Sequence, residues 1–255
     1  DSTVSAFDDA YFYPRYGWGT SLNRFFDSSK FEIKNIALSG RSSKSFITEP
    51  EYQELLAGMK QGDYLFIGFG HNDEKTEVER YTNPNGNSTV EGSFANSLYE
   101  NYIKPAEAVG CTPILMTPIV RRSDTGTFTN SQLHITTTAT VGDVVFEGGD
   151  YAQAIRDLGN EVNVKVVDLT ALTKELYEQL GASETLYLHA WLSSKEGSVD
   201  NTHTNIWGSI YNGYFIAKSI KEQGIAGLSE YVVDSMIQAA PAKSDYLVSN
   251  PSYVE

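Results

Sequence analysis

Residues 49–73, "EPEYQELLAGMKQGDYLFIGFGHND", decide the fold class because they combine a helix with a buried strand. Apolar residues recur at helical spacing in the first half of this stretch: Tyr52, Leu55, Leu56 and Met59. Gly62 then predicts the end of the helix. Residues 64–69 form a nearly continuous apolar run of strand length, which is typical of a strand covered on both faces.

The same order of helix and strand is expected along most of the chain. Helical spacing appears in residues 18–25, 94–102, 151–160, 169–181, 205–220 and, over a shorter stretch, 231–239. Short apolar strands are expected at residues 31–40, 112–119 and 164–169. Pro105 should kink or end the helix that begins near residue 94. This alternation predicts a three-layer α/β domain with a parallel sheet, whose active site lies at the carboxyl ends of the strands.

Two stretches interrupt this rhythm, residues 74–92 and residues 121–148, and both are expected to be loops that either form a functional rim or are disordered. The sequence shows neither an internal repeat nor a linker. We therefore expect one catalytic domain over residues 1–240 and a C-terminal tail over residues 241–255.

Charge and cysteine content exclude several classes of protein. The chain of 255 residues has 19 basic and 33 acidic residues, a formal net charge of −14, so nonspecific nucleic-acid binding is not expected. The single cysteine, Cys111, rules out an intrachain disulfide and is expected to be buried in a strand. No apolar run reaches the roughly 20 residues of a membrane span, and no signal-peptide pattern opens the sequence.

Four short blocks fall where strands should end, and they contain the parts of a hydrolytic site. The blocks are "DST" at 1–3, "SGRSS" at 39–43, "GFGHND" at 68–73 and "DNTH" at 200–203. Acyl transfer requires a hydroxyl nucleophile, a base, an acid that orients the base, and donors for the oxyanion. Ser2, His203 and Asp200 would form the triad, and Gly40 and Asn72 would be the donors.

Each block also has a purely structural interpretation. Asp-Ser is a common turn pair, Gly40 could end a strand, and Asn72 with Asp73 could cap a helix. The order and spacing of the blocks favour catalysis, since an aspartate three residues before a histidine can hold the tautomer of that histidine on one helical turn or a tight loop.

The four histidines also raise the question of a metal site. His71 and Asp73 are a conceivable ligand pair, but no second histidine lies four residues from His71, and no metal or other cofactor is expected. His71 and His189 are expected to be hydrogen-bonded polar residues near the cleft, and His134 is expected to face solvent.

Together the four blocks resemble the GDSL or SGNH hydrolase superfamily, and within it the rhamnogalacturonan acetylesterase-like branch. "YGWGTSL" at 16–22, "TPIVRR" at 117–122 and "VKVVDLTALTKELYEQLG" at 164–181 extend the resemblance over roughly residues 1–222. The resemblance implies a flavodoxin-like α/β/α sandwich with a mostly parallel five-stranded sheet.

In that family the serine of the first block is the nucleophile, and the aspartate and histidine of the last block complete the triad. The serine amide, the glycine of the second block and the asparagine of the third form the oxyanion hole. The resemblance therefore implies the same roles for Ser2, Asp200, His203, Gly40 and Asn72.

The resemblance also implies a substrate and a location. We expect an acetylated plant cell-wall polysaccharide or oligosaccharide, pectic rhamnogalacturonan first and xylan second. We also expect a secreted protein, with a cytoplasmic one as the alternative, and no nucleic-acid or membrane partners. His71, Trp191 and Arg121 are the candidate substrate-binding residues. Arg121 and Arg122 could contact an acidic galacturonate, or could pair with carboxylates of the protein itself.

The first block departs from the family pattern in one respect. In the family a glycine and a central β-strand precede the Asp-Ser pair, whereas this sequence starts at Asp1. Because a central strand cannot be removed without exposing two rows of backbone donors and acceptors, we expect a short segment upstream of residue 1, or another segment in its place.

Three alternative functions remain open at this stage. The first is a GDSL-type esterase that acts on lipid or other small esters. The second is a noncatalytic carbohydrate-binding or structural domain of the same fold, since a shared fold does not secure a shared activity. The third is a metal-dependent hydrolase.

Overall fold

The computed structural model describes residues 1–7, 12–191 and 198–247. Its internal contacts divide the chain into two units. Unit 1 comprises Asp1, Leu38–Pro118 and Phe128–Thr170, and unit 2 comprises Ser2–Ala37, Ile119–Thr127 and Ala171–Glu255. The prediction of one catalytic domain over residues 1–240 stays a prediction.

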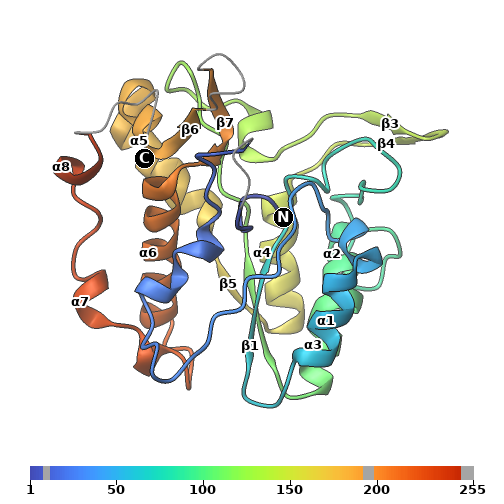
Figure 1. The fold of residues 1–255 in the computed structure, drawn as a ribbon. Helices are drawn as coiled ribbons and strands as arrows, with labels where there is room; N and C mark the ends of the chain where they lie inside the picture. The colour runs from blue at the N-terminus through green and yellow to red at the C-terminus, as the bar shows by residue number, and fades with distance from the viewer. Residues whose placement is uncertain (8–11, 192–197, 248–255) are drawn as a thin grey trace. The chain divides into compact units, whose positions relative to one another are not determined.

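A parallel sheet forms the centre of unit 1 (Figure 1). Its strands, in spatial order, are β1 (Tyr64–Gly68), β2 (Thr112–Met116) and β5 (Lys165–Val167). The prediction of an α/β protein with parallel strands at these three places is confirmed. The register places Ile67 beside Leu115, and Met116 beside Val167.

Helices cover one face of this sheet and enclose a hydrophobic core. They are α1 (Pro50–Gly58), α2 (Phe94–Leu98), α3 (Lys104–Ala108) and α4 (Tyr151–Val162). Ile67 and Leu115 face this layer together, and Phe94, Ile103 and Ile155 pack in the same cluster. These apolar residues recur at the helical and strand periods of the sequence, which is why the core was predictable.

Pro105 does not end the helix that begins at Phe94. A π-helical turn, η4 (Tyr99–Ile103), lies between α2 and α3, and the helix continues to Ala108. A wider turn just before the proline accommodates the missing N–H, so that both halves of the helix still bury their apolar residues.

Residues 121–148 were expected to be a loop, but they contain a β-hairpin. Its strands β3 (Ala139–Val141) and β4 (Val144–Phe146) are antiparallel and belong to unit 1, where they project away from the parallel sheet in Figure 1. Val144 and Val145 are largely exposed on this hairpin, so it lacks the apolar burial that would have identified it in the sequence.

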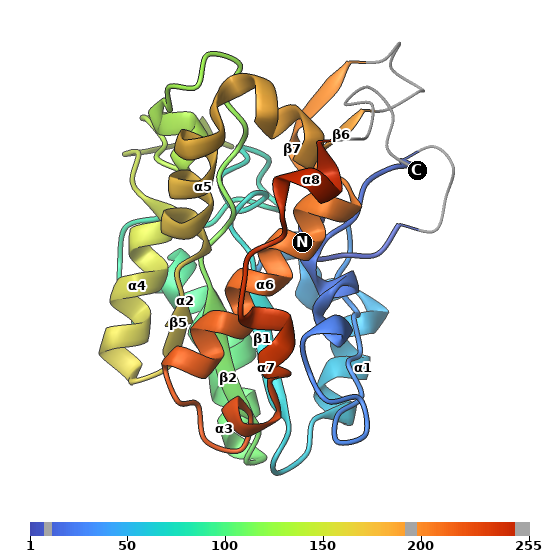
Figure 2. The same ribbon diagram turned by 90° about the vertical axis from the view of Figure 1, so that its left-hand side faces the viewer.

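Two long helices, two short ones and a second hairpin belong to unit 2. The helices are α5 (Leu169–Glu184), α6 (Ile206–Glu222), α7 (Asp234–Ile237) and α8 (Lys243–Tyr246), with a break in α5 at Gly181. Figure 2 shows α7 and α8 beside α6, and the ring of Tyr246 in α8 packs against those of Trp207 and Tyr211 in α6. The first part of the predicted tail is therefore packed, while residues 248–255 lie outside the described residues.

The hairpin of unit 2 carries two of the predicted triad residues. Strands β6 (His189–Trp191) and β7 (Val199–Thr204) pair antiparallel, with an irregular register between His189 and Trp191. Asp200 and His203 both lie on β7. Among the described residues, none of the helices combines the length and the apolar character that a membrane crossing requires.

Two predicted elements are wrong. The helix expected at residues 18–25 is a pair of 3₁₀ turns at Trp18–Thr20 and Leu22–Arg24, although Trp18, Leu22 and Phe25 are all buried as their spacing indicated. The glycines on either side of Trp18 lie against other backbone or side-chain atoms, so this segment follows its neighbours rather than a regular helix.

Residues 31–40 form no strand. Of the four strands expected within the sequence, the other three make up the parallel sheet of the described residues, in place of the five strands that the resemblance implied. The side chain of Asn35 donates to the Val4 carbonyl oxygen and accepts from the Ala37 amide at 2.8 and 3.2 Å. A strand requires a neighbouring strand for its backbone groups, and here side-chain bonds hold the extended segment in its place.

Candidate active site

Ser2 lies in a tight turn that the segment around Gly17 holds in place. The Gly17 amide donates to the Ser5 carbonyl oxygen at 3.0 Å, and the Gly19 amide donates to that of Val4 at 3.1 Å. A Cβ atom on Gly17 would lie 2.3 Å from the Val4 carbonyl carbon. Only glycine permits this close approach, so the "GWG" motif fixes the backbone that carries Ser2.

A continuous line of hydrogen bonds joins Ser2, His203 and Asp200 within unit 2. The Ser2 Oγ lies 2.8 Å from His203 Nε2, and His203 Nδ1 lies 2.9 Å from Asp200 Oδ2. Because a carboxylate can only accept, Nδ1 carries the proton and Nε2 accepts the hydroxyl proton of Ser2. The structure thus brings together the three residues that the sequence predicted as a triad.

Both oxygens of Asp200 have several donors. Its Oδ1 accepts from the backbone amides of Thr202 and His203 at 2.9 and 3.0 Å, which is the local turn expected from the three-residue spacing. Its Oδ2 accepts from His203 and also from Arg15, whose Nε and Nη2 lie at 2.8 and 2.5 Å. The carboxylate is thereby fixed from both sides.

These contacts set the charge states of the site. Burial alone would raise the pKa of Asp200, but the hydrogen bond and charge of His203 and the charge of Arg15 hold it well below its usual range. Burial lowers the pKa of His203, Asp200 partly opposes this effect, and the charges of Arg15 and Arg121 add to the lowering. At neutral pH the site therefore combines an ionised carboxylate with a neutral imidazole.

His189 is a buried, fully bonded histidine next to this site, as the sequence predicted. Its Nδ1 lies 2.8 Å from the Asp200 carbonyl oxygen, and its Nε2 lies 2.6 Å from the Tyr177 hydroxyl. Burial, aided by the charge of Arg122, lowers the pKa of His189 to about 4. His189 therefore stays neutral and supports the backbone of the residue that orients His203.

Gly40 and Asn72 lie in unit 1, in two segments that are connected by hydrogen bonds from Ser43 to the Asp73 carboxylate. Gly40 has a φ of 76° and Asn72 follows the carboxyl end of β1, where the sequence placed it. The buried Asp73 carboxylate accepts from the Ser43 amide, the Ser43 hydroxyl and the Gly70 amide at 2.5–3.2 Å. Burial raises the pKa of Asp73 to about 6 although these hydrogen bonds oppose the rise.

The side chain of Asn72 has a defined orientation. Its Oδ1 accepts from Arg80 Nη1 at 3.1 Å, and only 7% of the residue is exposed. This bond directs the amide oxygen to Arg80, so the NH₂ group is the end that an oxyanion would meet.

His134 does not face solvent, contrary to the expectation from its Ser/Thr-rich surroundings. It is fully buried in unit 1, its Nδ1 lies 3.2 Å from Glu74 Oε2, and its ring stands edge-on to that of His71 at 4.4 Å. A left-handed backbone at His134, with a φ of 62°, turns the chain inward at this point. His71 is also buried, and its predicted role in substrate binding stays a prediction.

The other two predicted substrate-binding residues belong to unit 2. Trp191 ends β6 and is half-buried, and residues 192–197, which follow it, lie outside the described residues. Arg121 is half-buried and lies close enough to His203 for its charge to lower the pKa of that histidine. Arg122 is buried, with hydrogen bonds to Asp124 and to the Ala182 carbonyl oxygen, so it pairs within the protein.

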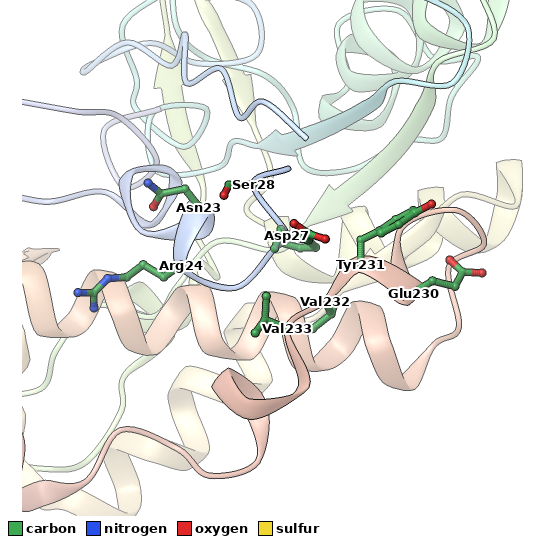
Figure 3. A pocket seen from close by; sticks show the side chains of 9 residues that line it. Asn23, Arg24, Asp27, Ser28, Glu230, Tyr231, Val232 and Val233 are labelled. Carbon is green, nitrogen blue, oxygen red and sulfur yellow. The ribbon is translucent and has the colours of Figure 1, made fainter. Parts of the chain in front are cut away.

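A polar pocket of about 450 Å³ lies elsewhere in unit 2 (Figure 3). Arg24, Asp27, Glu230 and Tyr231 are among the residues that line it, and none of the predicted site residues does. This pocket therefore gives no support to the predicted chemistry. Among the described residues, no group of three or more histidine, cysteine or acidic side chains has the arrangement of a metal site.

Arg15 is the residue near the triad that the sequence did not reveal. It lies 185 positions from Asp200 and belongs to none of the four blocks. Its only signal is its place among Phe12, Tyr13 and Tyr16 just before the "GWG" motif, and an arginine among aromatic residues has no specific meaning without the fold.

The arrangement has the chemical capacity for nucleophilic catalysis. A serine hydroxyl donates to a neutral imidazole, and a hydrogen-bonded carboxylate holds that imidazole in the tautomer that can remove the hydroxyl proton. The two bonds of 2.8 and 2.9 Å are within the range needed for proton transfer.

Comparison with known proteins also indicates a family of hydrolytic enzymes. A family model described as "GDSL-like Lipase/Acylhydrolase" matches residues 1–211. The rhamnogalacturonan acetylesterase RhgT of Bacillus subtilis is 31% identical over 218 residues, which is 83% of this chain and 83% of the relative. The probable rhamnogalacturonan acetylesterase YesY of the same organism is 30% identical over 235 residues, 91% of this chain and 94% of the relative.

A solved structure is also similar. The crystal structure of protein YxiM from Bacillus subtilis matches with a TM-score of 0.66 at 27% sequence identity. The match covers 89% of this chain and 56% of that chain.

Proposed function

This chain belongs to the GDSL-like lipase/acylhydrolase family, and from that premise we propose that it is a serine carbohydrate esterase that removes acetyl groups from a plant cell-wall polysaccharide. The observation that carries this proposal is the hydrogen-bonded line from Ser2 through His203 to Asp200. The rhamnogalacturonan acetylesterases among its relatives support acetylated rhamnogalacturonan as the first substrate to test, with acetylated xylan second. Secretion would bring such an enzyme to its polymer.

In the proposed reaction, His203 removes the proton of the Ser2 hydroxyl while Ser2 Oγ attacks the acetyl carbonyl carbon. The tetrahedral intermediate collapses as the sugar oxygen leaves with the proton from His203, which leaves an acetyl ester on Ser2. Water then attacks this ester with His203 as base, and acetate leaves as Ser2 regains its proton. Asp200 stabilises the imidazolium that forms in each step.

We propose three donors for the oxyanion: the amides of Ser2 and Gly40 and the side chain of Asn72. The family pattern supports this assignment, together with the positive φ of Gly40 and the orientation of the Asn72 amide toward Arg80. Preorganised donors of this kind account for a large part of the rate enhancement in acyl transfer.

Arg121 is our candidate for contact with an acidic sugar. Its charge acts on His203, whereas the buried Arg122 is bonded within unit 2. A carboxylate of galacturonate beside Arg121 would fit a pectic substrate, and this assignment distinguishes that substrate from uncharged xylan.

Acetate release by the unmodified protein and by Ser2→Ala tests the proposal. The substrates are acetylated rhamnogalacturonan, acetylated xylan and a long-chain nitrophenyl ester. We expect the unmodified protein to release acetate from one polymer, and Ser2→Ala to lose activity by a factor on the order of 10⁴ or more because the nucleophile is absent. Ser88→Ala, which removes a buried hydroxyl that donates to Glu161 in unit 1, is the matched control and should keep its activity.

The other outcomes separate the alternative functions. Preference for the long-chain ester would favour an esterase for lipids or small esters. Binding of acetylated polymer without acetate release, equal in the unmodified protein and Ser2→Ala, would favour a noncatalytic domain. Loss of activity in chelator would favour a metal-dependent hydrolase.

A further inference from the structure

Arg15 occupies a position that the proposed reaction does not explain. An arginine and a histidine from segments far apart in the sequence both donate to Oδ2 of Asp200, at 2.5–2.8 Å for Arg15 and 2.9 Å for His203. A triad requires only the second of these bonds. The first places a full positive charge against the oxygen that orients the base.

The surroundings of Arg15 hold it in this geometry. The residue is only 9% exposed, and its guanidinium carbon lies 4.7 Å from the ring centre of Phe12 and 6.0 Å from that of Phe7. Phe7 also stands edge-on to the ring of His203, at 6.1 Å. Aromatic rings on a guanidinium limit its rotamers and exclude water from its charge.

The backbone next to Arg15 is tied to the backbone next to His203. The Tyr16 amide donates to the Thr204 carbonyl oxygen at 2.8 Å, and the Thr204 hydroxyl donates to the Tyr16 carbonyl oxygen at 2.8 Å. Arg15 and His203 therefore approach Asp200 from two segments, and the next residue of each segment is hydrogen-bonded to the other.

We propose that Arg15 is a positioning residue of the triad, which fixes the Asp200 carboxylate and, by sharing its Oδ2 atom, limits the negative charge that His203 experiences. The guanidinium opposes rotation of the carboxylate, so that the lone pair toward His203 keeps its direction. It also offsets part of the negative charge that would otherwise stabilise the imidazolium.

The electrostatic consequence is a base that stays neutral at lower pH. The groups that act on His203 come from several segments: Asp200 on β7, Arg15, Arg121 in the 119–127 segment, and His189 on β6, which is uncharged above a pH of about 4. Asp200 alone favours the protonated imidazole, whereas both arginines disfavour it. Removal of Arg15 should therefore raise the pKa of His203, while Arg121 continues to lower it.

An NMR titration of His203 tests this inference without any use of activity. The chain has four histidines, and the His203 resonance is identified as the one that is missing in the His203→Gln variant. In Arg15→Met we expect the pKa of His203 to rise by about one pH unit. In Arg15→Lys, which keeps the charge but loses the planar pair of donors, the pKa should stay within a few tenths of a unit of the unmodified protein.

Arg156→Met is the matched control. Arg156 donates to Asp168 through Nε and Nη2 at 2.8 and 3.0 Å in unit 1, so the variant removes a similar arginine–aspartate pair that does not touch the triad. Thermal unfolding of each variant shows whether it is folded. An unchanged His203 titration in a folded Arg15→Met protein overturns the inference.

A second measurement in the unmodified protein covers the case in which Arg15→Met does not fold. The Nε–H group of Arg15 donates to the same Asp200 oxygen as His203 does. The resonance of this Nε proton should therefore shift as His203 gains or loses a proton during the titration. A resonance that is insensitive to this titration also contradicts the inference.

Kinetics then separate positioning from charge, and this step rests on the proposed function. We expect kcat on the preferred acetylated polymer to fall about ten- to a hundredfold in both Arg15→Met and Arg15→Lys, with KM nearly unchanged. In a plot of kcat against pH, the acidic limb should move to higher pH only in Arg15→Met. If neither the unmodified protein nor any variant releases acetate while the titrations behave as described, the esterase proposal fails and the role of Arg15 stands.

Discussion

Asp200 determines the state of two histidines through different atoms. Its carboxylate binds the Nδ1 proton of His203, and its backbone carbonyl oxygen binds that of His189. The two imidazoles differ at their other nitrogen, which meets the Ser2 hydroxyl in one case and the Tyr177 hydroxyl in the other. In the proposed reaction the first pair exchanges a proton with the substrate, whereas the second is buried on both sides and remains structural.

Asn72 provides a residue-level test of the oxyanion donors. We expect Asn72→Ala to lower kcat about 100-fold, equivalent to about 3 kcal/mol in the barrier, because a donor is lost from the transition state. KM should change little. Steady-state kinetics on the preferred polymer measure both constants.

The matched control for Asn72→Ala is Arg80→Met. It removes the bond of 3.1 Å to Asn72 Oδ1 and leaves the amide donor in place. A smaller loss in Arg80→Met than in Asn72→Ala is expected. Equal losses in the two variants, or a normal kcat in Asn72→Ala, would contradict a donor role for Asn72.

At this scale the sequence indicated the residues of the proposed triad but not their environment. Ser2, Asp200 and His203 belong to blocks with a recognisable chemical pattern, and the structure joins them by hydrogen bonds. Arg15 and the burial of His134 depend on contacts between distant segments. No local pattern encodes such contacts, so sequence reasoning could not find them.

Helix α6 is anchored at its start by Asn205, two residues after His203. The Asn205 side chain accepts from the amides of Trp207 and Gly208 at 2.9 and 3.1 Å, and donates to the carbonyl oxygens of Tyr187 and His189 at 2.7 and 3.2 Å. One buried amide therefore caps the helix and ties it to the start of β6.

Gly208 permits the close packing of α6 on its neighbours. A Cβ atom at this position would lie 2.2 Å from the Leu188 carbonyl oxygen and 2.6 Å from the Thr204 Cβ. The first turn of α6 therefore lies directly against the segments that precede β6 and end β7.

We expect Asn205→Ala to lower the free energy of unfolding by about 3 kcal/mol, because the helix cap and two buried carbonyl partners are lost together. Urea denaturation should show a lower midpoint with an unchanged slope. Asp150→Ala is the control: Asp150 caps α4 with a single, exposed bond to the Gln153 amide, and its loss should cost about 1 kcal/mol. Similar losses in both variants would contradict the linking role of Asn205.

Elements with strong periodicity were predictable and those held by their neighbours were not. The strands β1 and β2 and the helix α6 have continuous apolar or helical patterns, and they occur where the sequence placed them. The hairpins β3–β4 and β6–β7 pair short strands of three to six residues. Residues 31–40 have the composition of a strand but do not form one, and composition alone does not reveal that difference.

Net charge is the property of the whole molecule that bears most directly on the substrate. The chain has a formal charge of −14, and a galacturonate polymer is also negative. Encounter with such a polymer is opposed by long-range repulsion, which salt screens over about 30 Å at 0.01 M and about 8 Å at 0.15 M ionic strength.

If the substrate is acidic, KM on acetylated rhamnogalacturonan should fall several-fold when the ionic strength is raised from the lower to the higher of these two values, with kcat unchanged. An uncharged acetylated xylan oligosaccharide is the control, and its KM should not respond. A KM that rises with salt on the acidic polymer would show instead that local basic groups such as Arg121 dominate the encounter.

For the chain as a whole, the sequence was sufficient for the fold class and the family. The alternation of helices and strands indicated the first, and the set of four blocks indicated the second. The number of strands in the sheet was not predictable. It depends on which extended segments find a partner, a property of the assembled backbone and not of any one stretch.

The 201 positions that separate Ser2 from His203 have a consequence for biosynthesis. At about 5–20 residues per second, a ribosome needs roughly 10–40 s to travel from the codon of Ser2 to that of His203. Throughout that interval the nascent polypeptide holds a serine with no partner to activate it. Under the proposed mechanism, catalytic competence would therefore arise only after residue 203 has been translated.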